Sequence, residues 1–412
     1  MSQRPECYLL AVNITQSRWV GMIFLASSVA TFAIYSSIFD LLHRFDWDQP
    51  FVKLACFEAL FVLIVLVFFW RRARSTRPPD WVIATELFIA CAVLSWEVVR
   101  LVDLFQVGLR TGMNDLGSTT QDAVRLVLLE HGNPYVHEIA KNGNDPAFYG
   151  FKYGPGMLIG YALAALWPDG GGLKTCNLVY LATTVCLLAG LATRSENTSF
   201  RRRWLRLAPA AIVAALALWP ERPYHELFNQ GAVDMYPIML LVAAVACLDR
   251  KWWLGAGLAA GMSFSAKFSP AAFLLILFIR QRIPRRFVVG VAIGLVPFLP
   301  FLLWDAPSLI RNVFIFHSKK SFDTTSLYSV TPGELHYLFS VFQACAVAAA
   351  VVLNFRRPIE PRSLVVFFTL LLIAIEVSYR EIHGNHLIWF VPVVALSLTW
   401  YRHWLGRCVV PA

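Results

Sequence analysis

Long apolar segments recur along almost the whole chain, and they constrain the possible fold more than any other feature of the sequence. A helix of about 20 apolar residues crosses a lipid bilayer, and shorter helices can cross within a packed bundle. The chain is 58% hydrophobic and 15% charged, whereas soluble domains are about 45–50% apolar and about 25% charged. We therefore predict an all-α polytopic membrane protein.

The apolar segments predict about twelve transmembrane helices. They lie at residues 19–42, 51–70, 81–105, 173–193, 207–220, 235–248, 252–265, 270–279, 287–304, 334–355, 363–379 and 387–401. A further apolar run, 155–167, is too short for a comfortable span, so we expect it to lie in or dip into the outer leaflet. This division gives an N-terminal transmembrane hairpin at 1–80 and a transmembrane core at 81–412, with an outer loop at 106–168.

The basic clusters all fall on one side of these predicted spans. They lie at 71–77, 194–206, 250–251, 280–286, 356–362 and 402–407. The positive-inside rule makes this side cytoplasmic, and both chain termini with it. The net charge of +10 is then a signal of topology and not of nucleic-acid binding. We expect a multi-pass protein of the bacterial inner membrane without a cleavable signal peptide.

A polar stretch at 106–154 separates two apolar segments and is expected on the outer face. A loop of this length is uncommon unless it has a function. Asp115 lies in it, and its carboxylate can either take a proton from an acceptor hydroxyl or cap a helix that begins near Ser118. The pattern also predicts an amphipathic helix at 122–130.

Other outer segments carry further candidate residues. Glu226 and Asp234 precede the predicted span at 235–248, where a negative charge also complements the helix dipole. Lys267 interrupts an apolar run, which indicates a function unless the side chain snorkels to the surface. The remaining candidates are the cations His317, Lys319 and Lys320. This patch either binds a phosphate or consists of ordinary exposed charges.

Motifs for metals and cofactors are weak or missing. The eight cysteines include no CxxC pair, so neither a disulfide framework nor a cysteine-ligated metal is expected. The sequence has no P-loop, no GxGxxG after a strand and no HExxH. Asp46 and Asp48 form a DxD pair, and His383 lies close to His386, but two ligands alone make a weak site. We expect no cofactor and no bound metal.

Four local patterns occur in order along residues 81–412. The first is Asp115 followed by 132–135 (GNPY) and 152–155 (KYGP), and the second is 229–234 (NQGAVD) followed by 257–270 (GLAAGMSFSAKFSP). The third is 316–320 (FHSKK) with Ser326, and the fourth is 385–392 (NHLIWFVP). Together they resemble the GT-C glycosyltransferases. The resemblance is to the branch that depends on polyprenyl-phosphate sugars and includes glycosyltransferase family 87, with its mannosyltransferases.

The resemblance implies a GT-C-like fold and an enzyme that moves a sugar, mannose above all, from a polyprenyl-phosphate donor to a lipid or glycan acceptor at the outer face. It implies that Asp115 acts as general base in an inverting displacement that needs no metal. The donor phosphate would be held by Lys267, Lys319, Lys320 and His317. Further substrate contacts would come from Asn114, Tyr135, Tyr153, Glu226, Asp234 and His386.

A transporter or flippase of a lipid-linked sugar is the main alternative function. Transporters often have inverted repeats and broken helices at mid-membrane, and the sequence shows no such symmetry. Its polar residues gather at one face instead. A non-catalytic assembly subunit is a third class, in which Asp115 would be dispensable.

Overall fold

The structure is a computed structural model that describes residues 80–113, 115–137, 139, 150–167, 171–193, 207–218, 221–268, 274, 283–316, 331–356 and 388–389. These residues form helices and the turns between them, and no strand occurs among them. The DxD pair and five predicted spans lie outside the described residues. These spans are 19–42, 51–70, 270–279, 363–379 and 387–401, of which only Leu274, Ile388 and Trp389 are described.

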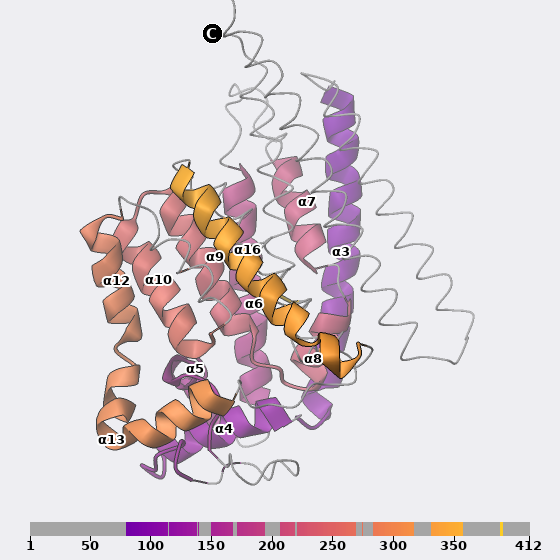
Figure 1. Cartoon of the computed structure of the whole chain (residues 1–412). Helices are drawn as coiled ribbons and strands as arrows, with labels where there is room; N and C mark the ends of the chain where they lie inside the picture. The colour runs from indigo at the N-terminus through magenta and orange to yellow at the C-terminus, as the bar shows by residue number, and fades with distance from the viewer. Residues whose placement is uncertain are drawn as a thin grey trace, which may run out of the picture.

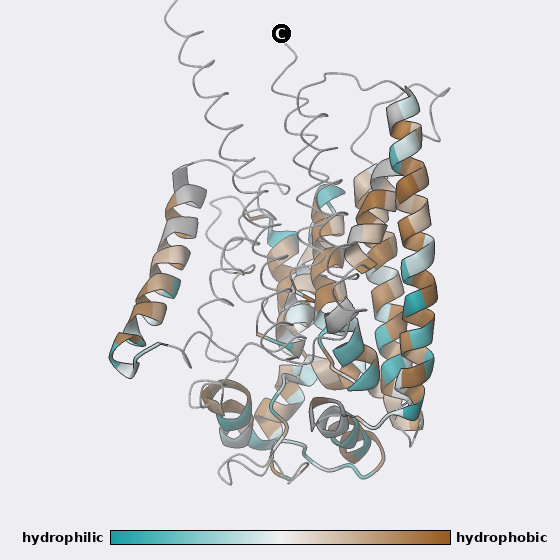
Figure 2. Cartoon of the chain, turned by 90° about the vertical axis from the view of Figure 1, so that its right-hand side faces the viewer, coloured by the Kyte–Doolittle hydropathy of each residue, from teal (hydrophilic) through white to brown (hydrophobic). Residues whose placement is uncertain are grey.

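Most of the described helices stand side by side and form the body of a bundle (Figure 1). They are α3 (Asp80–Arg110), α6 (Gly171–Thr193), α7 (Leu207–Leu218), α9 (Met235–Asp249), α10 (Trp253–Ala266) and α12 (Arg285–Leu295). The short η4 (Gly333–Leu335) precedes α16 (Tyr337–Arg356), which runs obliquely to the others in Figure 1. Figure 2 shows that apolar residues dominate the upright helices and that polar residues gather toward the lower end.

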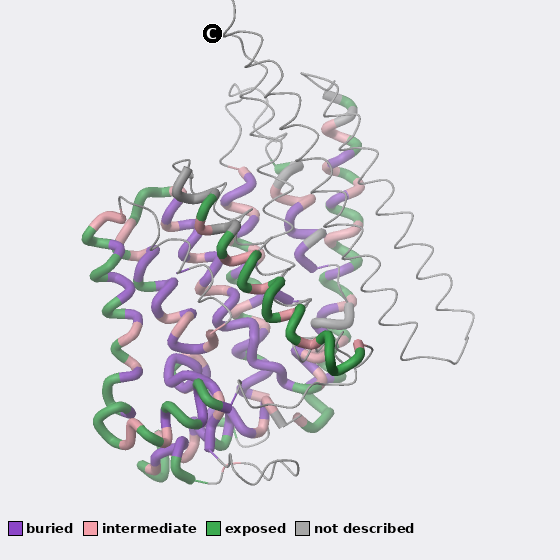
Figure 3. The backbone as a smooth tube through the Cα atoms, in the orientation of Figure 1, coloured by how far each residue is buried: buried purple, intermediate pink, exposed green. Residues whose placement is uncertain are grey.

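Shorter elements lie at this lower end of the bundle. They are α4 (Asp115–Leu128), α5 (Pro155–Gly160), η1 (Ala162–Leu166), α8 (Glu221–Asn229), α13 (Phe298–Ile310) and the π-helix η3 (Arg311–Ile315). Most of α5 is buried, and Figure 3 shows that this buried region continues into the interior of the bundle. The polar segments of the chain are therefore built into the packed structure at one end.

The apolar runs predict several helix bounds closely. The predicted spans at 173–193, 207–220, 235–248 and 252–265 agree with α6, α7, α9 and α10 to within two residues. Two described helices, Gly171–Thr193 and Phe298–Ile315, are long and apolar enough to cross a membrane, so the total of about twelve spans stays a prediction. Residues 155–167 form only α5 and η1, of six and five residues, and neither is long enough to cross.

The predicted span at 287–304 is helical on both sides of an interruption. The helix breaks after Leu295, and α13 begins at Phe298. Pro297 lies at the break, and a proline lacks the N–H that a continuous helix needs and clashes with the preceding turn. Asp305 has non-helical torsion angles (φ −159°, ψ 87°), so α13 is itself kinked. In Figure 1 the chain turns here and runs across the lower end of the bundle.

Glycines set the close contact between α10 and α12. Gly257 and Gly261 on α10 face Gly290 and Gly294 on α12, in the four-residue spacing that lets two helix backbones approach. A Cβ atom on Gly261 would lie 2.6 Å from the carbonyl oxygen of Val291, and one on Gly294 would lie equally close to a carbonyl of α10. Cβ atoms on the other two glycines would collide with backbone oxygens outright. Any side chain here must push the helices apart.

We therefore expect Gly257→Ala to destabilise the protein by about 1–3 kcal/mol, the usual cost of overpacking. The measurement is the apparent melting temperature in detergent. Gly190→Ala is the matched control, because a Cβ on Gly190, inside α6, would meet no described atom outside its own helix within 4 Å. Alanine favours a helix over glycine, so this control should melt at the wild-type temperature or above. Equal melting of the two variants would show that the glycine contact is unimportant.

Candidate active site

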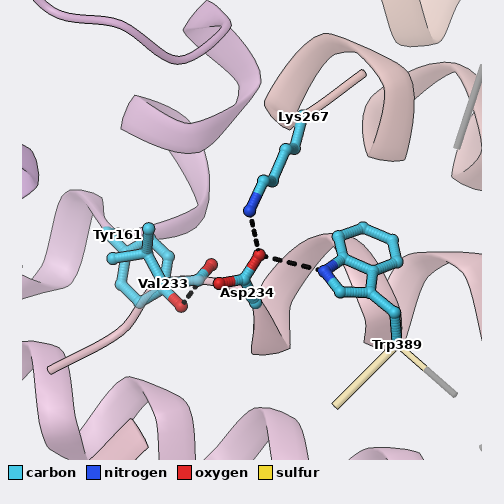
Figure 4. A network of polar contacts seen from close by, with 5 residues as sticks. All are labelled: Tyr161, Val233, Asp234, Lys267 and Trp389. Carbon is cyan, nitrogen blue, oxygen red and sulfur yellow. Dashed lines mark hydrogen bonds and ion pairs between the residues drawn. The ribbon is translucent and has the colours of Figure 1, made fainter. Parts of the chain in front are cut away.

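A buried ion pair joins the start of α9 to the end of α10 (Figure 4). Asp234 immediately precedes α9 and is fully buried, and Lys267 immediately follows α10. The Lys267 ammonium pairs with Oδ1 of Asp234, and Trp389 Nε1 donates to the same oxygen at 3.0 Å. Asp234 makes no capping hydrogen bond to α9. Its carboxylate is thus directed at two donors outside its own helix.

Glycines bring the loop before α5 against the end of α10. Gly154 N donates to Ala266 O at 3.1 Å, and Cβ atoms on Gly154 or Gly156 would collide with Ser265. This contact places the Tyr153 ring 5.8 Å from Lys267 Nζ.

The Trp389 ring lies 5.9 Å from the same nitrogen. Lys267 therefore sits between one carboxylate and two aromatic rings, which attract a cation. Its side chain keeps 15% of its surface exposed.

All four of the local patterns found in the sequence contribute to this region. Tyr153 comes from the first pattern, Asp234 and Lys267 from the second, and Trp389 from the fourth. Phe316 is the described residue of the third, and its ring lies 4.3 Å from the Nζ atom of Lys152, the neighbour of Tyr153. Segments that are far apart in the sequence thus meet in one place, as expected of a functional site.

Asp115 is the first residue of α4. The helix therefore begins three residues before Ser118, where the sequence predicted its start. An acidic residue in the first helical turn is favoured by the helix dipole. The predicted amphipathic helix at 122–130 is the second half of α4, which ends at Leu128.

The start of α4 packs against the turn that leads to Asp234. A Cβ atom on Gly117 would lie 2.7 Å from the carbonyl oxygen of Gly231, and one on Gly231 would lie 3.2 Å from Cγ of Met113. Gly231 has a φ of +73°, which glycine adopts without strain. The backbone at Asp115 therefore lies beside the segment that carries Asp234.

Tyr135 is a buried residue that positions Tyr153. Its side chain is 1% exposed, and its hydroxyl donates to Tyr153 O at 3.0 Å. Burial raises the pKa of the Tyr135 hydroxyl well above its usual range, so the group is a neutral hydrogen-bond donor. Asn312, in the π-helix η3, donates to Tyr135 O at 2.8 Å. In this structure Tyr135 holds Tyr153 in place.

Glu226 lies on α8 and is half-buried. Its carbonyl oxygen accepts from Gln230 N and Ala232 N, both at 3.2 Å, and so closes the turn before Asp234. Five other predicted site residues lie outside the part of the chain that the structure describes: Asn114, His317, Lys319, Lys320 and His386.

Sequence reasoning assigned no role to three supporting residues, Trp389, Tyr161 and Asn177. Tyr161 donates to Asn177 Oδ1 at 2.5 Å and to Val233 O at 3.2 Å, and Asn177 donates to Ala232 O at 2.7 Å. The backbone just before Asp234 is thus fixed from two sides, and Figure 4 shows the bond from Tyr161 to Val233. Asn177 had a detectable signal, because a polar residue inside an apolar span is unusual.

No group of three or more His, Cys, Asp or Glu side chains among the described residues is placed to hold a metal ion. The described cysteines are free thiols: Cys91, Cys176, Cys186, Cys247 and Cys345.

Comparisons with known proteins place the chain in a family. The sequence profile of glycosyltransferase family 87 matches residues 151–375, more than half of the 412 residues. No curated protein matches the chain significantly.

Among solved structures, two crystal structures of ArnT from Cupriavidus metallidurans are similar, one bound to undecaprenyl phosphate and one in the apo state. Both are 16% identical to the chain, with TM-scores of 0.45 and 0.44, and the similarity covers 78% and 76% of this chain. The chain spans 60% of the length of either ArnT structure. On the family match, which includes Tyr153, Asp234 and Lys267, the chain belongs to glycosyltransferase family 87, a family of GT-C glycosyltransferases.

Proposed function

We propose that this protein is an inner-membrane glycosyltransferase that moves a sugar, mannose above all, from a polyprenyl-phosphate donor to a lipid or glycan acceptor. The observation that carries the proposal is the Lys267 ammonium, held between a buried carboxylate and two aromatic rings within the region matched by the family. A fixed cation at one end of a membrane bundle suits a lipid phosphate. The adjacent aromatic rings suit the apolar face of a sugar.

The proposed reaction is a direct displacement at the anomeric carbon of the donor sugar. Asp115 takes the proton of the acceptor hydroxyl as that oxygen forms its bond to the anomeric carbon. The bond from this carbon to the phosphate oxygen breaks, and the electron pair leaves with the polyprenyl phosphate. Attack opposite the leaving group inverts the anomeric configuration.

Lys267 would stabilise the charge that develops on the departing phosphate. An ammonium group has three N–H donors, and the structure assigns one of them to Asp234. Asp234 then has a positioning role, because it fixes the direction of the ammonium before the donor binds. We assign Lys319, Lys320 and His317 to the same phosphate as further cations, and Asn114, Glu226 and His386 to contacts with the sugar or acceptor.

The geometry of α9 and α10 supports an active site on the non-cytoplasmic face. The two helices are joined by a short turn that contains Arg250 and Lys251. Asp234 and Lys267 lie at the opposite end of this pair, because the 15 residues of α9 extend about 22 Å at 1.5 Å per residue. Basic residues favour the cytoplasm. The site then faces outward, with both chain termini proposed to be cytoplasmic.

Two measurements test the function. In the first, purified protein in lipid vesicles is given polyprenyl-phosphate mannose, polyprenyl-phosphate glucose or GDP-mannose, together with a membrane lipid extract as acceptor. We expect transfer from a polyprenyl-phosphate sugar and none from the nucleotide sugar. In the second, mass spectrometry compares the glycolipids of cells with and without the protein, and a glycolipid one sugar shorter should accumulate without it. Movement of a lipid-linked sugar across the vesicle membrane without any transfer would overturn the proposal and indicate a flippase.

A further inference from the structure

A second buried lysine, Lys174, lies in the first turn of α6 and is 1% exposed. Its ammonium donates to several backbone carbonyl oxygens: Gly108 O at 2.5 Å, Thr111 O at 2.7 Å, Asn229 O at 3.3 Å and Gly112 O at 3.4 Å. The Thr111 hydroxyl oxygen lies 3.4 Å from the same nitrogen. A lysine is almost never buried this fully without a compensating interaction.

The acceptors lie at the ends of two helices. Gly108 is in the last turn of α3, with Thr111 and Gly112 directly after it, and Asn229 is the last residue of α8. The C-terminus of a helix carries roughly half a negative charge. Two such ends facing one ammonium therefore compensate most of its charge. Lys174 thus binds the ends of α3 and α8 together.

The segments that follow these two ends carry the two carboxylates of the proposed site. Asp115 begins α4 shortly after Gly112, and Asp234 follows Asn229 by five residues. A further bond joins the two segments directly, because the Thr111 hydroxyl donates to Asn229 O at 2.8 Å.

We infer that Lys174 is a positioning residue for glycosyl transfer, which holds the start of α4 in register with the Asp234 segment. It acts through Asp115 and does not contact the donor. The inference rests on the proposed function, since it assigns Asp115 the role of general base. Loss of this register moves the base relative to the acceptor, and a misplacement of about 1 Å can slow a reaction by about 100-fold.

Lys174→Met is the first test, because methionine keeps the aliphatic stem and removes the ammonium. We expect kcat to fall by about 10- to 100-fold with the KM for the polyprenyl-phosphate sugar changed less than about threefold. The melting temperature should fall, because the variant leaves these carbonyl oxygens without their donor, so kcat is compared per folded molecule. Lys251→Met is the control, as Lys251 is exposed in the turn between α9 and α10. A variant that melts lower but keeps the wild-type kcat per folded molecule would assign Lys174 a structural role only.

Thr111→Val is the second test of the positioning role, and it is needed if Lys174→Met does not fold. This change removes the hydroxyl that joins the two segments and keeps the shape of the side chain. We expect a fall in kcat of about three- to tenfold at unchanged donor KM. Thr193→Val is its control, because the Thr193 hydroxyl donates only within α6, to Gly190 O at 3.0 Å.

The outcomes separate this inference from the function on which it rests. A wild-type protein that transfers no sugar overturns the proposed function, and the inference with it. An active wild type with wild-type kcat in folded Lys174→Met, or in Thr111→Val where Lys174→Met does not fold, overturns the inference alone.

Discussion

Replacing Asp115 with asparagine should slow sugar transfer by about 10²- to 10⁴-fold and leave donor binding unchanged. Asparagine has nearly the same size but cannot accept the proton of the acceptor hydroxyl. The loss corresponds to about 3–5 kcal/mol of transition-state stabilisation. The measurement is single-turnover transfer by purified protein at saturating donor, together with donor affinity measured separately.

A competing explanation of this expected result is a structural role of Asp115 at the start of α4. A capping role would survive the substitution, because asparagine caps a helix about as well as aspartate. The remaining structural role is a favourable charge in the first turn, worth about 0.3–1 kcal/mol, which is too small to account for the expected loss. Asp122→Asn is the matched control, because Asp122 is exposed on the same helix. Wild-type transfer by Asp115→Asn would rule out the general base.

The parts of the fold that depend on local sequence could be predicted. The bounds of α6, α9 and α10 follow from the lengths of their apolar runs, because burial of an apolar helix in a bundle or bilayer is a property of the segment itself. The break between α12 and α13 was missed because the apolar run continues through it. The proline at 297 was the available local signal.

The site could be predicted only in part, because its contacts join distant segments. Lys267 was recognised as functional from the cost of a lysine in an apolar run. Its pairing with Asp234 could not be read from the sequence, since neither residue carries a local sign of the other. Trp389 lies 155 residues from Asp234 and meets it only in the folded chain. Lys174 was overlooked because a lysine at the edge of a span is normally a surface residue.

The Asp234–Lys267 pair should give the second large effect, and it separates two roles of Lys267. Lys267→Met alone leaves a fully buried carboxylate without its cation, which costs about 3–5 kcal/mol of stability. Adding Asp234→Asn removes the uncompensated charge, while an asparagine oxygen can still accept from Trp389 Nε1. The double variant should therefore recover most of the lost melting temperature.

Donor affinity should not recover in the same way. If Lys267 holds the donor phosphate, both variants that carry Lys267→Met lack a charge-assisted contact of about 1.5–3 kcal/mol, so donor binding weakens by about 10- to 100-fold in each. Asp234→Asn alone keeps the ammonium and should bind the donor with a smaller loss. Lys251→Met, at an exposed position, is the control for removal of a positive charge. Wild-type donor affinity in the double variant would mean that Lys267 serves only to neutralise Asp234, and the phosphate would then have to be held by the cations at His317, Lys319 and Lys320.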